Sequence, residues 1–232
     1  TQVTAAPDFD PNAGFAEEAF ASTEEVEVEL DPAEEEGPGE IPLIGQTAAA
    51  DAIQTGIERA FTVGAPTLVA LEGGRGSGRT RLLIFASEIA ARMADKVRVQ
   101  YAACREGGDG AYAPFSRMLL ERFGVTPASS PSAVRAQMTT TVRNALQTSD
   151  AIEVGQVTHL LGHMAGIPFP DSPFLTPLQD DPAELHARAI RALARLTEGD
   201  GQARPVLLLL DNMHFAEDAA WDVVEALTKT DA

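Results

Sequence analysis

Apolar and polar residues beyond position 40 follow two different spacings along the chain. Three short segments have the length and apolar character of buried strands, and they cover residues 67–71, 97–102 and 206–210. Apolar residues recur at helical spacing in three other segments, over residues 47–61, 79–93 and 216–227. Because strands that alternate with helices form parallel sheets covered by helices, this order predicts an α/β fold.

Three more helices are expected between the second and third strands, because each has a recognisable start signal. Ser130 precedes a proline, which favours a serine N-cap with proline in the first helical turn. Asp150 with Glu153, and Asp181 with Glu184, resemble capping boxes in which aspartate replaces Ser or Thr. These helices are expected to form a helical insertion ahead of the last strand.

The first 40 residues differ in composition from the rest of the chain. They contain 13 acidic residues, no Lys or Arg, and several prolines. Such a segment buries too little apolar surface to offset the entropy lost on ordering. We therefore expect residues 1–40 to be a disordered acidic linker and residues 41–232 to carry the folded part.

Composition argues against several classes of protein. The formal net charge is −18, whereas direct binding to nucleic acid or to an anionic membrane needs clustered positive charge. Cys104 is the only cysteine, so no internal disulfide can form. No apolar stretch approaches the roughly 20 residues of a membrane-spanning helix, and the start lacks the pattern of a secretory signal. We expect a cytoplasmic protein and, because the chain begins at Thr1, a piece of a longer polypeptide.

The strongest chemical signal is the glycine-rich stretch of residues 71–80. Gly73, Gly78, Arg79 and Thr80 have the spacing of the phosphate-binding loop GxxxxGK[ST], with arginine in place of lysine. The glycines allow a tight turn whose amides point at phosphate oxygens, and the following helix adds the positive end of its dipole. The alternative is a glycine-rich turn without a ligand. A strand before the stretch and a helix after it favour the phosphate loop.

Asp211 is the second chemical signal, because it follows the aliphatic run of residues 206–210. The carboxyl ends of buried parallel strands are where α/β sheets bind ligands. There the carboxylate of Asp211 would hold Mg²⁺ beside a nucleotide, and the hydroxyl of Thr80 would be a second ligand. The alternative is an aspartate that only ends a strand and caps the next helix.

Together these motifs make residues 44–228 resemble the P-loop ATPase domain of the STAND and AAA-like class. The most similar modules are the Orc1-like AAA domains of large bacterial signalling regulators. The matching pieces are LIGQ (43–46), GGRGSGRTRLL (73–83), YAACREGGDGAYAPF (101–115), LLGHMAGIPFPDSPF (160–174) and VLLLLDNMHFAEDAAWDVVEAL (206–227).

The resemblance implies a parallel P-loop NTPase sheet, with the helical insertion before the Walker B strand, and a module that binds ATP with Mg²⁺. Its metal ligands would be Thr80 and Asp211. The residues that it places around the nucleotide are Gly45, Gln46, Gly73, Gly74, Arg75, Gly76, Ser77, Gly78, Arg79, Thr80 and Arg81. The partners that it implies are other domains of the same polypeptide: a kinase, cyclase or DNA-binding output domain and TPR repeats.

Three residues depart from the family pattern. Arg79 replaces the lysine of the loop, and its planar fork is not equivalent to an ammonium at a tight phosphate site. Asn212 follows the metal-binding aspartate where an acidic residue is usual, and an amide cannot accept a proton from the attacking water. Gln46 stands where arginine is common. Glu217 or Asp218 could take the place of the missing base.

These departures favour a regulatory switch that binds ATP and hydrolyses it weakly or not at all. One alternative is a degenerate scaffold that binds partner proteins and no nucleotide. Another is a competent ATPase in which Arg79 and Glu217 suffice.

The family pattern also predicts that the domain continues beyond Ala232. In the family, a further strand carrying a sensor residue inserts between the phosphate-loop strand and the Walker B strand, and a helical lid follows. We therefore expect residues 41–232 to be the N-terminal part of the domain, with a gap in its sheet.

Two other clusters are candidates of lower rank. His159 and His163 lie one helical turn apart, which suits either metal binding or packing. Arg188, Arg191 and Arg195 form a basic stripe, which suits a solvated helix face, the docking of the acidic tail or a contact to a γ-phosphate.

Overall fold

The computed structural model describes residues 45–229, except for residues 94–96, 109 and 127–128. The expected linker of residues 1–40 and the first two residues of the LIGQ motif lie outside this range. The elements in chain order are α1 (Thr47–Val63), α2 (Arg79–Met93), β1 (Arg98–Ala103), α3 (Phe115–Arg122), α4 (Pro131–Leu146), α5 (Ala151–Met164), η2 (Thr176–Leu178), α6 (Pro182–Ala203), β2 (Val206–Asp211), η3 (Met213–Phe215) and α7 (Asp218–Thr228).

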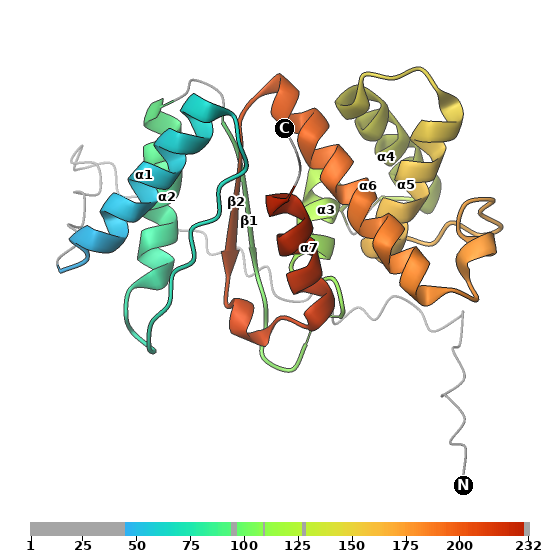
Figure 1. The fold of residues 1–232 in the computed structure, drawn as a ribbon. Coiled ribbons are helices and arrows are strands. Elements are labelled where there is room, and N and C mark those ends of the chain that lie inside the picture. The colour runs from blue at the N-terminus through green and yellow to red at the C-terminus, as the bar shows by residue number, and fades with distance from the viewer. Residues whose placement is uncertain (1–44, 94–96, 109, 127–128, 230–232) are drawn as a thin grey trace, which may run out of the picture. The chain divides into compact units, whose positions relative to one another are not determined.

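The two strands form a parallel sheet, which confirms the α/β prediction in its coarse form (Figure 1). Arg98 pairs with Val206 at one end of the ladder, and Ala103 pairs with Asp211 at the other. Because the strands are parallel, both carboxyl ends lie at the same edge of the sheet. Segments that follow β1 and β2 therefore meet at one place.

Both faces of β2 are covered by apolar side chains. Leu207 and Leu209 pack in a cluster with residues of α1 and α2. Leu208 and Leu210 pack in a second cluster, built mainly from α3 to α7. Successive side chains of a strand point to opposite faces, so two covered faces require the unbroken aliphatic run of this strand.

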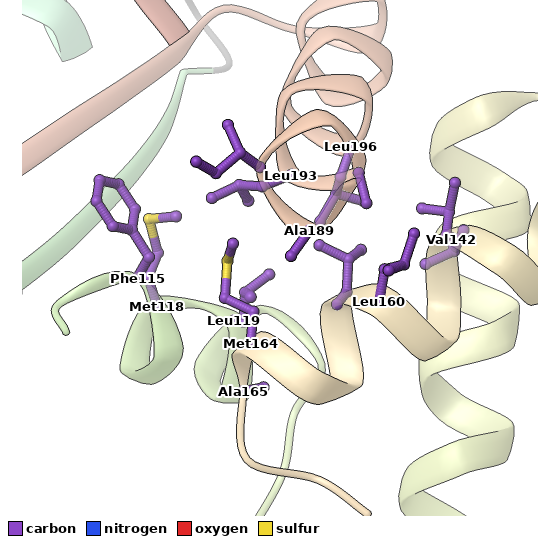
Figure 2. Packing of buried hydrophobic residues seen from close by; sticks show 14 of the residues in the cluster. Phe115, Met118, Leu119, Val142, Leu160, Met164, Ala165, Ala189, Leu193 and Leu196 are labelled. Carbon is purple, nitrogen blue, oxygen red and sulfur yellow. The ribbon is translucent and has the colours of Figure 1, made fainter. Parts of the chain in front are cut away.

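The expected helical insertion consists of α3, α4, α5 and α6, and its interior is the larger of the two clusters. Figure 2 shows Met118 and Leu119 of α3 beside side chains of α5 and α6. Phe115, Leu119 and Leu193 are at most 1% exposed. α6 also packs against α7, so the insertion is joined to the helix that follows β2.

A buried ion pair joins the insertion to the start of β1. The carboxylate of Asp200, on α6, accepts hydrogen bonds from Arg122 Nε at 2.8 Å and Arg122 Nη2 at 2.7 Å. Arg98 Nε lies 3.7 Å from the same carboxylate. Asp200 is only 6% exposed, so this ion pair is buried between α6, α3 and β1.

The three predicted N-caps are confirmed, but the complete capping boxes are not. Ser130, Asp150 and Asp181 each accept a hydrogen bond from a backbone amide of the helix that follows. In a complete capping box, the glutamate side chain also accepts a hydrogen bond from the backbone amide of the N-cap residue. Here the Asp150 amide bonds the Thr148 hydroxyl, and the Asp181 amide bonds the Leu178 carbonyl. Other partners near the N-cap have replaced the glutamate side chains.

The prediction of a buried strand at residues 67–71 is wrong. This segment is irregular in the structure, and Leu68 is 60% exposed. Within the described ranges no backbone pairs with it, and a strand needs a neighbour for its amides and carbonyls. Instead Val69 lies over α1, because a β-carbon built on Gly56 would come within 2.6 Å of Val69 Cγ2. The apolar pattern indicated burial, but the missing partner decided the conformation.

The close crossing of α4 and α6 makes a stability prediction. A β-carbon at Gly199 would lie 2.3 Å from the Ala145 carbonyl oxygen, whereas one at Gly201 would meet nothing within 4 Å. We expect Gly199→Ala to destabilise the fold by about 1–3 kcal/mol, since the helices must separate. Gly201→Ala, on the same helix, should be neutral or stabilising by up to about 1 kcal/mol. Urea unfolding measures both variants, and equal unfolding midpoints would contradict the crossing.

Candidate functional site

Asp211 ends β2 at the carboxyl edge of the sheet, where its side chain is only 8% exposed. Three donors hold its carboxylate. The Thr80 hydroxyl donates to Oδ2 at 3.0 Å, and the Tyr101 hydroxyl donates to the same oxygen at 3.2 Å. The Asn212 amide donates to Oδ1 at 2.7 Å. The structure therefore brings together the two predicted metal ligands, Thr80 and Asp211, which are 131 positions apart.

Tyr101 is a member of this site that the sequence reasoning did not identify. It lies on β1 opposite Leu209, two positions before the pair of Ala103 with Asp211. Burial raises the pKa of the Tyr101 hydroxyl, the neighbouring Asp211 carboxylate raises it further, and Arg117 partly opposes them. The phenol thus stays protonated and able to donate at neutral pH. A tyrosine one residue before the end of the expected strand 97–102 was the available signal, but its partner depends on the strand register.

The glycine-rich loop has the backbone that its sequence requires. Gly76 has φ of +80° and Gly78 has φ of +78°, a left-handed conformation that favours glycine. The Ser77 amide closes a turn by bonding the Gly74 carbonyl at 3.2 Å. Helix α2 starts at Arg79, so the amides of its first residues lack acceptors within the helix and are available to an anion.

Side chains around the loop explain two of its glycines. A β-carbon at Gly73 would lie 2.5 Å from Ser77 Oγ, and one at Gly78 would lie 2.9 Å from Gln46 Nε2. Gly74, by contrast, borders open space. Ser77 Oγ is buried and has no hydrogen-bond partner among the described residues. The loop is tightly packed on one side and open on the other.

Gln46 ties the LIGQ motif to this loop. Its side-chain amide donates to the Ser77 carbonyl, across 31 positions of sequence. Gly45 precedes it with φ of +76°. The residue that departs from the usual arginine therefore supports the loop backbone.

The three arginines of the loop region differ in their surroundings. Arg79 is half-buried at the start of α2, and Arg75 is exposed on the loop. Within the described part of the chain neither forms a hydrogen bond or an ion pair. Arg81 instead pairs with Glu88, with Nη1 3.1 Å from Oε1. Among the described residues, therefore, no carboxylate pairs with the half-buried guanidinium group of Arg79.

Asn212 and the two candidate bases, Glu217 and Asp218, follow β2 in the chain. Asn212 is exposed and has φ of +55°, and its backbone rather than its side chain contacts Asp211. Glu217 precedes α7, and its Oε1 lies 3.7 Å from a β-carbon built on Gly108, in the segment after β1. Asp218 is the first residue of α7. The role of Glu217 or Asp218 as a base remains a prediction.

The histidine pair and the basic stripe, the two candidates of lower rank, both contact other side chains of the protein. His159 Nδ1 bonds Ser172 Oγ at 2.6 Å, while the His163 ring packs edge-on against Tyr112. No group of three or more His, Cys, Asp or Glu side chains in the described ranges is arranged to hold a metal ion. In the basic stripe, Arg188 and Arg191 pair with Glu184, and Arg195 pairs with Glu153. These ion pairs favour the solvated-face interpretation of the stripe.

Residues 42–232 match the family model described as the AAA ATPase domain. The chain belongs to the AAA ATPase domain family. Comparisons with curated proteins and with solved structures found no match. The family typically uses ATP and Mg²⁺, so membership indicates nucleotide binding. Among the described helices of this AAA ATPase domain, none is both long and apolar enough to cross a membrane.

The side chains present fit a magnesium nucleotide. Carboxylate and hydroxyl oxygens are ligands that Mg²⁺ prefers, and Asp211 and Thr80 supply one of each. Mg²⁺ usually takes few protein ligands and keeps positions for phosphate oxygens and water, so two ligands are sufficient. The loop amides and Arg79 would supply the positive charge that the phosphates require.

The loop backbone makes the second prediction. Gly78→Ala should destabilise the chain by about 1–2 kcal/mol, because alanine is disfavoured at positive φ and its β-carbon would approach Gln46. Gly74→Ala is the control, since a β-carbon there meets nothing within 4 Å. Thermal unfolding followed by circular dichroism compares the two, and a Gly74→Ala variant as unstable as Gly78→Ala would contradict this loop geometry.

Proposed function

We propose that this AAA ATPase domain is an ATP-binding regulatory switch within a multidomain bacterial signalling protein of the STAND or Orc1-like class. Hydrolysis by the domain is weak or absent. The observation that carries the proposal is the hydrogen bond from Thr80 to Asp211. It joins the end of the phosphate loop to the carboxyl edge of the sheet, where a magnesium nucleotide would contact both.

Each part of the site has a distinct role in binding. The loop amides and the guanidinium of Arg79, which has no ion-pair partner among the described residues, bind the phosphates. Thr80 and Asp211 hold Mg²⁺, which when bound neutralises phosphate charge and orients the phosphate chain. Gln46 supports the loop through the Ser77 carbonyl.

Weak hydrolysis follows from the residue after Asp211. Asn212 cannot act as a general base, and its exposed side chain makes no hydrogen bond within the described residues. A nucleotide that is bound but turned over slowly acts as a lasting signal. Its binding energy then shifts the population between two arrangements of the protein, which is how a switch operates.

The wider setting belongs to the same proposal. Other domains of the polypeptide, with kinase, cyclase or DNA-binding output, would read the nucleotide state in the cytoplasm. The segment itself is acidic, with a net charge of −18, so direct contact with nucleic acid is left to such a domain.

Calorimetric titration of ATP in MgCl₂ tests nucleotide binding. Arg79→Ala should weaken binding by about 10- to 100-fold, because a buried charge-assisted contact to phosphate is worth about 1.5–3 kcal/mol. Arg143→Ala is the control, because Arg143 is an exposed arginine of α4 outside the glycine-rich loop, and it should retain nearly full affinity. Absence of binding heat in the unaltered protein would refute the proposal and favour the scaffold alternative.

Phosphate release tests hydrolysis in the same preparations. We expect release close to the buffer background in the unaltered protein. A second candidate function, a competent ATPase, is favoured by the position of Glu217 over the segment after β1. Rapid release that is lost in Glu217→Gln but retained in Glu225→Gln, an exposed glutamate of α7, would establish that candidate instead.

A further inference from the structure

The two oxygens of the Asp211 carboxylate have unequal surroundings. Oδ1 accepts a bond from the Asn212 amide of its own chain segment, at 2.7 Å. Oδ2 accepts bonds from two side chains, Thr80 at 3.0 Å and Tyr101 at 3.2 Å. The carboxylate cannot rotate about its Cβ–Cγ bond without losing contacts on both oxygens.

Tyr101 reaches Asp211 from a rigid element. In the register of the sheet, Tyr101 is opposite Leu209 and Ala103 is opposite Asp211. Side chains two positions apart on a strand share a face, so Tyr101 and Asp211 project from the same face, diagonally across the ladder. Thr80 reaches the carboxylate from α2 on that face, because α2 packs against Leu209.

Packing alone does not account for the position of Tyr101. The residue is 48% exposed and belongs to neither apolar cluster, although it lies on a central segment of β1. Its hydroxyl makes its hydrogen bond with a carboxylate that is 8% exposed. A half-exposed tyrosine that gives its hydroxyl to a predicted metal ligand is well placed to orient that ligand.

We propose that Tyr101 is a positioning residue for the Mg²⁺ site, holding the Asp211 carboxylate in the orientation that receives the metal ion. This inference rests on the proposed function. Thr80 is itself a metal ligand, so its hydroxyl is committed to the ion when the ion is present. Tyr101 is then the side chain that continues to restrain Oδ2.

Removing the Tyr101 hydroxyl is expected to lower the affinity for Mg²⁺ and not the affinity for metal-free ATP. Hydrogen-bond partners of metal ligands typically change metal affinity by about 10- to 100-fold. Because the Asn212 amide still holds Oδ1 when Tyr101 is removed, we expect the lower end, a loss of about 10-fold. Affinity for ATP without metal should not change, since Tyr101 contacts Asp211 rather than the phosphate loop.

The test uses the two tyrosines of the chain. ATP affinity is measured in excess MgCl₂ and in EDTA for the unaltered protein, Tyr101→Phe and Tyr112→Phe. Tyr112→Phe is the matched control, because the Tyr112 hydroxyl bonds His186 Nδ1 at 2.9 Å and not Asp211. The affinity gained on adding Mg²⁺ should fall about 10-fold in Tyr101→Phe alone, with unchanged affinity in EDTA. Melting temperatures of the two variants check that both are folded.

The other outcomes separate this inference from the proposed function. The positioning role is overturned if Mg²⁺ raises the ATP affinity of Tyr101→Phe as much as that of the unaltered protein. It is also overturned if Tyr101→Phe weakens ATP binding equally in MgCl₂ and in EDTA. Either result leaves nucleotide binding by the domain intact. ATP binding that gains nothing from Mg²⁺ in the unaltered protein also overturns the positioning role. No ATP binding under either condition refutes the proposed function itself.

Discussion

The carboxylate of Asp211 is the point at which three separate parts of the chain are held together. It ends β2, it accepts a hydrogen bond from the first turn of α2, and it accepts another from β1. A buried carboxylate needs hydrogen-bond donors around it, and Asp211 is only 8% exposed, so the loop, the helix and the neighbouring strand are constrained by the same group. The hydrogen bond from Thr80 thereby holds the start of α2, next to the glycine-rich loop, at the carboxyl edge of the sheet.

Charge is distributed so that this edge stays available to an anion. Four arginines of the helical insertion pair with carboxylates of the described residues: Arg122 with Asp200, Arg188 and Arg191 with Glu184, and Arg195 with Glu153. Arg79, at the phosphate loop, has no such partner in the described part of the chain. In a protein with a net charge of −18, a half-buried guanidinium without a carboxylate is a specific local feature. It gives the loop a positive charge that the chain as a whole lacks.

Local signals accounted for most of the secondary structure, because they act over a few residues. Ser130, Asp150 and Asp181 cap helices where their side chains predicted, and glycines 76 and 78 adopt the positive φ that a phosphate loop requires. Hydrogen-bond partners that depend on the three-dimensional arrangement were less predictable. The Asp150 and Asp181 amides bond Thr148 and Leu178 in place of the expected glutamates, and Tyr101 was not recognised as a neighbour of Asp211.

The sequence by itself determined the α/β class, the turn of the glycine-rich loop, the helix starts and the aliphatic run that became β2. These features depend on backbone sterics, capping and hydrophobic periodicity, all of which are local. Only the tertiary structure decided that residues 67–71 are irregular, with residues 67–70 exposed, that Gln46 supports the loop, and that Thr80 and Tyr101 share one oxygen of Asp211. A strand or a shared hydrogen bond needs a partner distant in sequence. The strand register and the packing of the domain determine which residue lies close enough to be that partner.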